Sequence, residues 1–277
     1  MDKKNIKFNK RLGILAGILV VGVAASVGNK VEFGIGTKEY KKAEHIPVLE
    51  EGQNADAVAS WLQASEIEEH STTANSIRAT MKDTDVSKIV LVNKEHPLAE
   101  TYSIDLKWLA SGREQVASEI YEPLMRMLSD GTDQGLSFVV ASGYRSQEYQ
   151  QKIWDDTIKM WTRQGMSEEE AAHEAAKTLA YPGESEHATG LAVDIVSEKY
   201  QLLDDGQNDT EESKWLRENC AQYGFILRYP PNKEDVTGIH YESWHFRYVG
   251  SEVAKCIMEN GITLEEYLEY AEKELEG

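Results

Sequence analysis

The 277-residue chain is long enough to bury one sizeable core, and its 41% hydrophobic and 28% charged residues are ordinary for a globular protein. Its formal net charge of −19 argues against nucleic acid as a partner and against docking on anionic lipid, because both are polyanionic. The basic residues are unevenly placed, since residues 1–30 hold six Lys/Arg and one Asp.

Residues 12–28 contain no charged side chain and directly follow five basic residues between positions 3 and 11. This pattern is typical of a membrane anchor or an export signal. The positive flank stays cytoplasmic, so we expect residues 1–11 to be a cytoplasmic basic segment and residues 12–28 to be a single-pass transmembrane anchor. No clear A-x-A cleavage site follows, which favours an anchor over a cleaved signal peptide that would leave the protein secreted. Both alternatives place the bulk of the chain outside the cytoplasm.

Residues 29–86 are polar and acidic, with a Ser/Thr cluster at Ser71–Thr73, and are expected to form an extracytoplasmic stalk. A short apolar run, Ile89–Val92, then marks the change to a folded domain, expected over residues 87–277.

The pattern within this domain alternates between helices and short strands. Helices are expected over 116–128, 146–163, from 167 to about 179, 212–223, 251–260 and from 263 onward, and strands over 136–141, 191–196, 225–229 and 245–249. Capping boxes at Ser167 and Thr263 open two of the helices, and Gly224 and Gly261 end two others. These elements predict an α+β fold, a small and mainly antiparallel sheet flanked by helices.

The stretch Ser185–Asp194 reads S-x-H-x-x-G-x-A-x-D, and Glu242–His245 reads E-x-W-H. Together they supply two imidazoles and two carboxylates, the set that a catalytic zinc site needs for three ligands and a nearby base. His187 or Asp194 alone would more often be a core histidine or a surface carboxylate.

The expected strand at 191–196 places Asp194 and the small Ala192 on one face and Leu191, Val193 and Ile195 on the other. Glu242 and His245 are three residues apart, so they can meet at one site only if the chain bends between them. Trp244 would then fill the wall behind the site. His240 is a competing ligand candidate, interpreted as a residue of the pocket rim.

The chain has two cysteines, Cys220 and Cys256, each in an expected helix. Outside the cytoplasm they could form a disulfide, and two buried thiols are an equal alternative. Neither lies in a spacing typical of metal ligands.

Several motifs in a fixed order resemble the VanY-type D-alanyl-D-alanine carboxypeptidases. This is the peptidase M15B type of zinc D,D-peptidase, a group that also includes the VanX dipeptidases and the hedgehog signalling domain. The matching motifs are Leu91–Lys94, Ser142–Ser146 with Gln150, Ser185–Asp194, Gly224–Pro231 and Glu242–Gly250. They extend from residue 89 to about residue 268 and imply a hedgehog/D,D-peptidase-like fold.

The resemblance implies that His187, Asp194 and His245 bind one Zn²⁺ and that Glu242 is the general base. Arg145 is implied to hold or polarise the substrate near its carboxylate or its scissile carbonyl, a role that suits a planar guanidinium. Ser185, Gln150, Tyr144 and Trp244 are implied to contact the substrate. The chain departs from the family at Ser243, where a proline is usual and would preset the bend beside Glu242.

The implied function is removal of the C-terminal D-Ala from peptidoglycan stem peptides, with a contribution to glycopeptide resistance by analogy. An L,D-carboxypeptidase acting on tetrapeptide stems is the alternative within the same enzyme class. A non-catalytic, metal-stabilised module that binds the cell wall is an alternative from another class, although it would have no need of the base. No nucleic acid and no obligate protein partner is implied.

Overall fold

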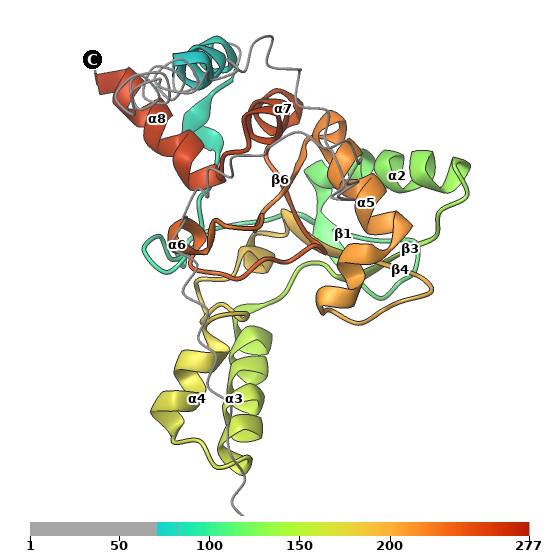
Figure 1. Cartoon of the computed structure of the whole chain (residues 1–277), viewed down its shortest axis with the longest axis vertical. Helices are drawn as coiled ribbons and strands as arrows, with labels where there is room; N and C mark the ends of the chain where they lie inside the picture. Colours follow the sequence, from blue (N-terminus) through green and yellow to red (C-terminus); the bar gives the residue numbers. More distant parts are fainter. Residues whose placement is uncertain (1–70, 83, 277) are drawn as a thin grey trace, which may run out of the picture. The chain divides into compact units, whose positions relative to one another are not determined.

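A four-stranded antiparallel sheet forms the centre of the fold (Figure 1), in the order β3 (Phe138–Ser142), β4 (Ala192–Ser197), β6 (His245–Tyr248), β5 (Phe225–Leu227). The computed structural model describes residues 71–82 and 84–276, which belong to one compact unit, Ala55–Gly277. The small antiparallel sheet among helices agrees with the expected α+β class.

One face of the sheet packs against α2 (Ser118–Asp133) and α5 (Glu211–Asn219), which is followed by the 3-10 turn η4 (Cys220–Tyr223). The helix α2 presents Ile120, Leu124 and Met127 at helical spacing, and all three are fully buried. They meet Val193 and Ile195 of β4, which with Leu191 were predicted to face the core, and Leu191 belongs to the same cluster. The opposite face of β4, with Ala192 and Asp194, is therefore left for the polar site.

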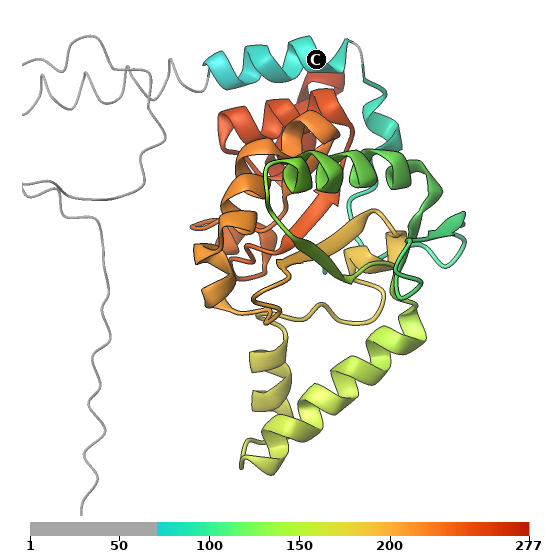
Figure 2. The same ribbon diagram turned by 90° about the vertical axis from the view of Figure 1, so that its right-hand side faces the viewer.

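A second hydrophobic cluster lies at the β5 end of the sheet, where α7 (Ser251–Asn260) and α8 (Leu264–Glu276) pack. Its buried members include Ile226, Ile257 and Tyr267. The described end of the expected stalk also belongs here. Residues 71–81 form a helix beside α8 (Figure 2), Ile77 is fully buried in the cluster, and Arg78 pairs with Glu274. Packing of the domain thus begins before the expected boundary at residue 87, because this helix carries an apolar side chain that its polar composition concealed.

The remaining expectations for the N-terminal part, the basic segment at 1–11, the anchor at 12–28 and most of the stalk, lie outside the described residues. Among the helices of the described part, none combines the length and the apolar character that crossing a membrane requires.

The sequence-based prediction missed some short elements and misplaced the ends of others. A two-stranded hairpin, β1 (Leu106–Trp108) and β2 (Gln115–Ala117), precedes α2, so the helix expected from residue 116 begins at Ser118. Three-residue strands give no measurable alternation, and tertiary pairing decides them. Short helical turns are η1 (Val86–Lys88), η2 (Glu186–Thr189), η3 (Asp205–Asp209) and α6 (Glu234–Thr237).

The helices α3 (Gln147–Arg163) and α4 (Glu168–Ala175) form a hairpin that extends away from the sheet (Figures 1 and 2). The Ser146 side chain accepts the Tyr149 amide at the start of α3, and the capping box predicted at Ser167 is present. Gln150 is the buried residue of α3, and its side chain reaches back toward the sheet.

The strand β3 contains a bulge that matters for the site. Val140 lies opposite Ile195, but Ser142 rather than Ala141 lies opposite Asp194. Two residues of β3 therefore oppose one residue of β4, which places Ser142 beside Asp194 and leaves Ala141 exposed.

The two cysteines are both buried and are not joined by a disulfide. Cys220 packs in the cluster under α2, whereas Cys256 packs in the cluster around α8. This outcome matches the alternative of two buried thiols.

Candidate active site

Three predicted ligands converge on the polar face of the sheet. Asp194 lies in the middle of β4, His245 opens β6 directly opposite it, and His187 lies in η2, the turn that leads into β4. All three side chains are buried, and their ligand atoms lie within 4.8 Å of one another. Gly190 ends η2 with φ of 67°, a left-handed conformation that allows the sharp entry into the strand.

The nitrogen atoms of the two histidines are assigned by their other contacts. The Nδ1 atom of His187 is 2.8 Å from the Gly143 carbonyl oxygen, so its Nε2 atom faces Asp194, 3.3 Å from Oδ2. His245 approaches Asp194 through Nδ1, 2.9 Å from Oδ1. The two rings meet edge to face at 4.9 Å between their centroids.

The donor set fits a tetrahedral zinc ion. Ligand bonds of roughly 2.1 Å in a tetrahedron place neighbouring donor atoms roughly 3.4 Å apart. The 3.3 Å separation between Nε2 of His187 and Oδ2 of Asp194 is close to this value, and Nδ1 of His245 lies 2.9 Å from the other oxygen, Oδ1. All three ligand atoms lie within 4.8 Å of one another. A backbone carbonyl that accepts the second nitrogen of His187 is the outer partner that metal-bound histidines usually have.

Glu242 is placed beside the three ligands by a bend in the chain. The His245 amide donates to the Glu242 carbonyl oxygen at 3.4 Å, which closes a tight turn, and the Glu242 amide donates to the Tyr229 carbonyl at 3.2 Å. The expected bend is thus present although Ser243 replaces proline. The Glu242 carboxylate lies 3.8 Å from Nδ1 of His245.

Burial sets the protonation of Glu242. Removal from water, with a smaller contribution from the Asp194 charge, raises the pKa of Glu242 to about 8, against the opposing charges of His245 and Arg145. Before metal binds, Glu242 therefore holds its proton at neutral pH.

The other groups respond to the same burial and to each other. Burial would lower the pKa of His245, but its hydrogen bond to Asp194 and the nearby carboxylates of Glu186 and Glu242 raise the pKa to about 9. Burial lowers the pKa of His187 despite the nearby Asp194. Burial would raise the pKa of Asp194, yet the two histidines hold it well below its usual range. Asp194 is thus the fixed anion of the site.

Arg145 is held from both sides. Its guanidinium donates to Gln150 Oε1 at 2.8 Å and to Ser142 Oγ at 2.9 Å, and it lies 3.8 Å from Asp194 Oδ2. Gln150 in turn donates to the Ala180 carbonyl. The bulge in β3 and the hairpin of α3 and α4 therefore jointly fix one cation next to the metal ligands.

A small cavity of about 50 Å³ lies among these groups. Its lining includes Arg145, Gln150, Ser185, Glu242 and both histidines. Ser185 and Gln150 thus lie in the same wall as the proposed base, and their contact with substrate stays a prediction. Of the described residues around this cavity, Tyr144 and Trp244 are not part of the lining. Trp244 instead lines a neighbouring cavity together with Glu242 and His240.

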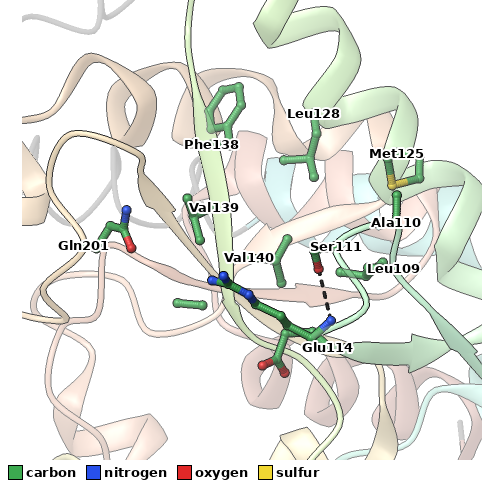
Figure 3. A pocket seen from close by; sticks show the side chains of 12 residues that line it. Leu109, Ala110, Ser111, Glu114, Met125, Leu128, Phe138, Val139, Val140 and Gln201 are labelled. Atoms are coloured by element: carbon green, nitrogen blue, oxygen red, sulfur yellow. Dashed lines mark hydrogen bonds between the residues drawn. The ribbon is translucent and has the colours of Figure 1, made fainter.

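A larger cavity of about 630 Å³ lies away from the proposed metal ligands, beside the edge strand β3 (Figure 3). It is lined by α2 residues such as Leu128, by β3 and by the loop between β1 and β2. Glu114 of that loop accepts the Gly143 amide at 2.9 Å. The wall of this cavity thereby supports the same turn that orients His187.

Sequence reasoning missed the residues behind His245. Glu186, Arg228 and Arg247 are fully buried, and the Tyr229 ring lies tilted against the His245 ring, 4.9 Å between centroids. A signal was available, because Arg228 and Arg247 interrupt apolar strands at positions that face inward, and a buried cation requires a buried anion.

Comparison with known proteins agrees with this geometry. The model of the VanY family of D-alanyl-D-alanine carboxypeptidases matches residues 113–251, half of the chain. The chain belongs to this family. The D-alanyl-D-alanine carboxypeptidase of Enterococcus faecalis is 40% identical over 182 residues, which cover 65% of this chain and 65% of that protein.

Two similar solved structures share this fold. The vancomycin-resistance D,D-pentapeptidase VanY, a mutant in complex with Zn(II), matches with a TM-score of 0.60 and 38% identity over 66% of this chain and 99% of that one. The LD-carboxypeptidase LdcB matches with a TM-score of 0.56 and 37% identity over 65% of this chain and 85% of that one. The expected fold, the enzyme class and zinc as the metal are thereby confirmed.

Proposed function

We propose that this VanY-family enzyme removes the C-terminal D-Ala from peptidoglycan stem peptides that end in D-Ala–D-Ala. The observation that carries the proposal is the joint placement of three metal ligands, a buried carboxylate and a fixed arginine around one cavity. His187, Asp194 and His245 hold the zinc in this proposal. Bound there, zinc supplies a water that ionises near neutral pH and a Lewis acid for the scissile carbonyl.

Glu242 acts as the general base and then as the general acid. Its carboxylate takes a proton from the attacking water and delivers it to the leaving amine of D-Ala. The buried position supports this role, because a carboxyl with a pKa raised toward neutrality exchanges protons readily in both directions.

Arg145 binds the end of the substrate. A guanidinium held by Gln150 and Ser142 presents a rigid fork to a carboxylate or a carbonyl oxygen. Ser185 contributes a further polar group to the wall of the cavity. A terminal carboxylate paired with Arg145 restricts cleavage to the last residue of the peptide.

The test is product analysis on a defined stem pentapeptide with the zinc-loaded full chain. We expect release of one D-Ala, loss of release with a chelator, and recovery on addition of zinc. Glu242→Ala should abolish release while zinc stays bound, and Glu252→Ala, at an exposed carboxylate, serves as the matched control. Absence of D-Ala release from the zinc-loaded protein would contradict the proposal.

A second candidate is L,D-carboxypeptidase activity on tetrapeptide stems, which the likeness to LdcB favours. The two activities require the same metal, base and carboxylate-binding arginine and differ in the stereochemistry of the residue before the cleaved bond. Turnover of pentapeptide and tetrapeptide, measured side by side, distinguishes them. Zinc binding without turnover of either peptide would instead indicate a wall-binding module.

The proposal extends to location and physiology. Residues 12–28, uncharged and preceded by a basic flank, anchor the chain in the cell membrane with the catalytic domain outside. Protease accessibility of the domain in intact cells tests this topology. Removal of D-Ala–D-Ala ends also eliminates the target of glycopeptides, so deletion of the gene should increase glycopeptide sensitivity where the activity contributes.

A further inference from the structure

Glu186 occupies an unusual position directly behind the proposed metal centre. Its side chain is completely buried, and one oxygen, Oε1, accepts from Arg228 Nε at 2.8 Å and from Arg247 at 2.7 Å. Both arginine side chains are also buried. Burial would raise the pKa of Glu186, but the two guanidinium groups hold it well below its usual range, so the carboxylate stays charged.

The second oxygen of Glu186 is buried and has no hydrogen-bond partner among the described residues. It faces Nε2 of His245, 3.6 Å away, and this nitrogen is likewise buried without a partner. Two unsatisfied polar atoms that face each other carry a cost, because buried donors and acceptors are nearly always paired. An approach of roughly 0.6 Å brings them into the usual range for a hydrogen bond.

The position of Glu186 is fixed from a distance. Arg228 forms a two-pronged pair with Glu265 at the start of α8, and Arg247 donates to the backbone carbonyls of Val90 and Tyr248. Both arginines are therefore anchored independently of the metal site. A purely structural ion pair would use both carboxylate oxygens of Glu186, but here one is left for His245.

We infer that Glu186 is a positioning residue that accepts the Nε2–H of His245 and thereby keeps the Nδ1 lone pair directed at the metal. The inference rests on the proposed ligand set. A neutral imidazole can carry its proton on either nitrogen, and only the Nε2–H tautomer binds metal through Nδ1. Carboxylates that accept from a ligand histidine also make it a better ligand, and their loss typically weakens metal affinity 10- to 100-fold.

The test compares Glu186→Gln with Glu265→Gln in the full chain. Both variants remove one carboxylate from the same arginine network, but only Glu186 faces His245. Zinc affinity is measured by competition with a chelator, on protein shown to be folded by circular dichroism. We expect Glu186→Gln to bind zinc roughly 10- to 100-fold more weakly and Glu265→Gln to bind within roughly threefold of wild type. Equal affinities for the two variants would overturn the inference.

Two further measurements test the role of Glu186, and the first of them does not require a folded Glu186→Gln variant. In the zinc-loaded wild type, nitrogen-15 NMR should show His245 with a proton on Nε2 that exchanges slowly with water. Cobalt(II) substituted for zinc should give a d–d spectrum that changes in Glu186→Gln but not in Glu265→Gln. A proton on Nδ1 of His245 in the loaded wild type would refute the inference even if Glu186→Gln failed to fold.

His245→Ala separates this inference from the ligand assignment on which it rests. If zinc affinity survives His245→Ala, the proposed ligand set is wrong. If His245→Ala loses affinity and Glu186→Gln does not, only the role of Glu186 is wrong.

Discussion

Asp194 and His245 lie directly opposite each other on β4 and β6, and Oδ1 of the carboxylate is 2.9 Å from Nδ1 of the imidazole. Strand pairing, rather than a flexible loop, therefore sets the spacing of two of the three proposed ligands. Because strand pairing already holds these two donor atoms close together, metal binding loses less conformational entropy than it would at a flexible site.

Replacement of Asp194 by Asn tests this pair. The amide keeps the shape of the side chain but removes the anion that both histidines face. We expect zinc affinity to fall by more than roughly 100-fold, beyond the loss typical of an outer partner. Chelator competition measures it, with thermal unfolding as the control for the fold. Retention of wild-type affinity would contradict the ligand role.

The metal-free protein should lose stability as pH rises. The folded pKa of Glu242, about 8, lies above its ordinary value of 4.5, so the stability of its neutral form is complete below pH 4.5 and is lost as pH rises through about 8. His245, raised from 6.5 to about 9, acts in the same direction. At pH 9, the free energy of unfolding of the metal-free Glu242→Gln variant should be ~2–4 kcal/mol higher than that of the metal-free wild type. Urea unfolding measures the difference. An identical pH dependence for both would contradict the pKa assignment.

Zinc binding should release protons. At pH 7 the site holds a proton on Glu242 and a charged His245, whose Nδ1 must be free to bind metal. We expect a net release of about one to two protons per zinc at pH 7 and an affinity that increases up to about pH 9. Calorimetry in buffers of different ionisation enthalpy measures the release. A heat independent of buffer would rule it out.

Arg145→Lys should separate substrate binding from metal binding. Lysine keeps the charge but cannot reproduce the fork held by Gln150 and Ser142. We expect kcat/KM to fall roughly ten- to hundredfold, in line with about 1.5–3 kcal/mol for a charge-assisted hydrogen bond. Zinc content should stay unchanged. A peptide amide, which lacks the terminal carboxylate, should show a much smaller difference between the two proteins.

Ser243→Pro should be tolerated. The Ser243 hydroxyl is buried and has no hydrogen-bond partner among the described residues. The turn from Glu242 to His245 is already closed by a backbone hydrogen bond. A proline that fits the existing turn should stabilise the protein by about 0.5–1 kcal/mol through the unfolded state. Chemical denaturation measures the change. A lower stability or a lower kcat would show that serine at this position serves another purpose.

Much of the site was predictable because its residues lie in compact motifs whose order along the chain is specific. The orientation of Asp194 and Ala192 followed from alternation in one strand, and the bend at Glu242 followed from the demand that two residues share a site. The pairing of Glu186 with the two buried arginines was not predictable, because Arg228 directly follows β5, Arg247 lies in β6, and both meet η2 only in the folded sheet. The hairpin β1–β2 and the helix at 71–81 were missed because short or polar segments take their structure from what they pack against.

The extra residue in β3 also bears on how members of this fold can diverge. Ser142 reaches the side of Asp194 only because Ala141 is accommodated as a bulge. Regular pairing without the bulge would place Ala141 opposite Asp194 and Ser142 opposite Val193, so the Ser142–Arg145 segment would move by one residue while His187, Asp194 and His245 kept their places. The register of one edge strand therefore decides whether this fold, with the same three proposed metal ligands, can also hold the end of a peptide.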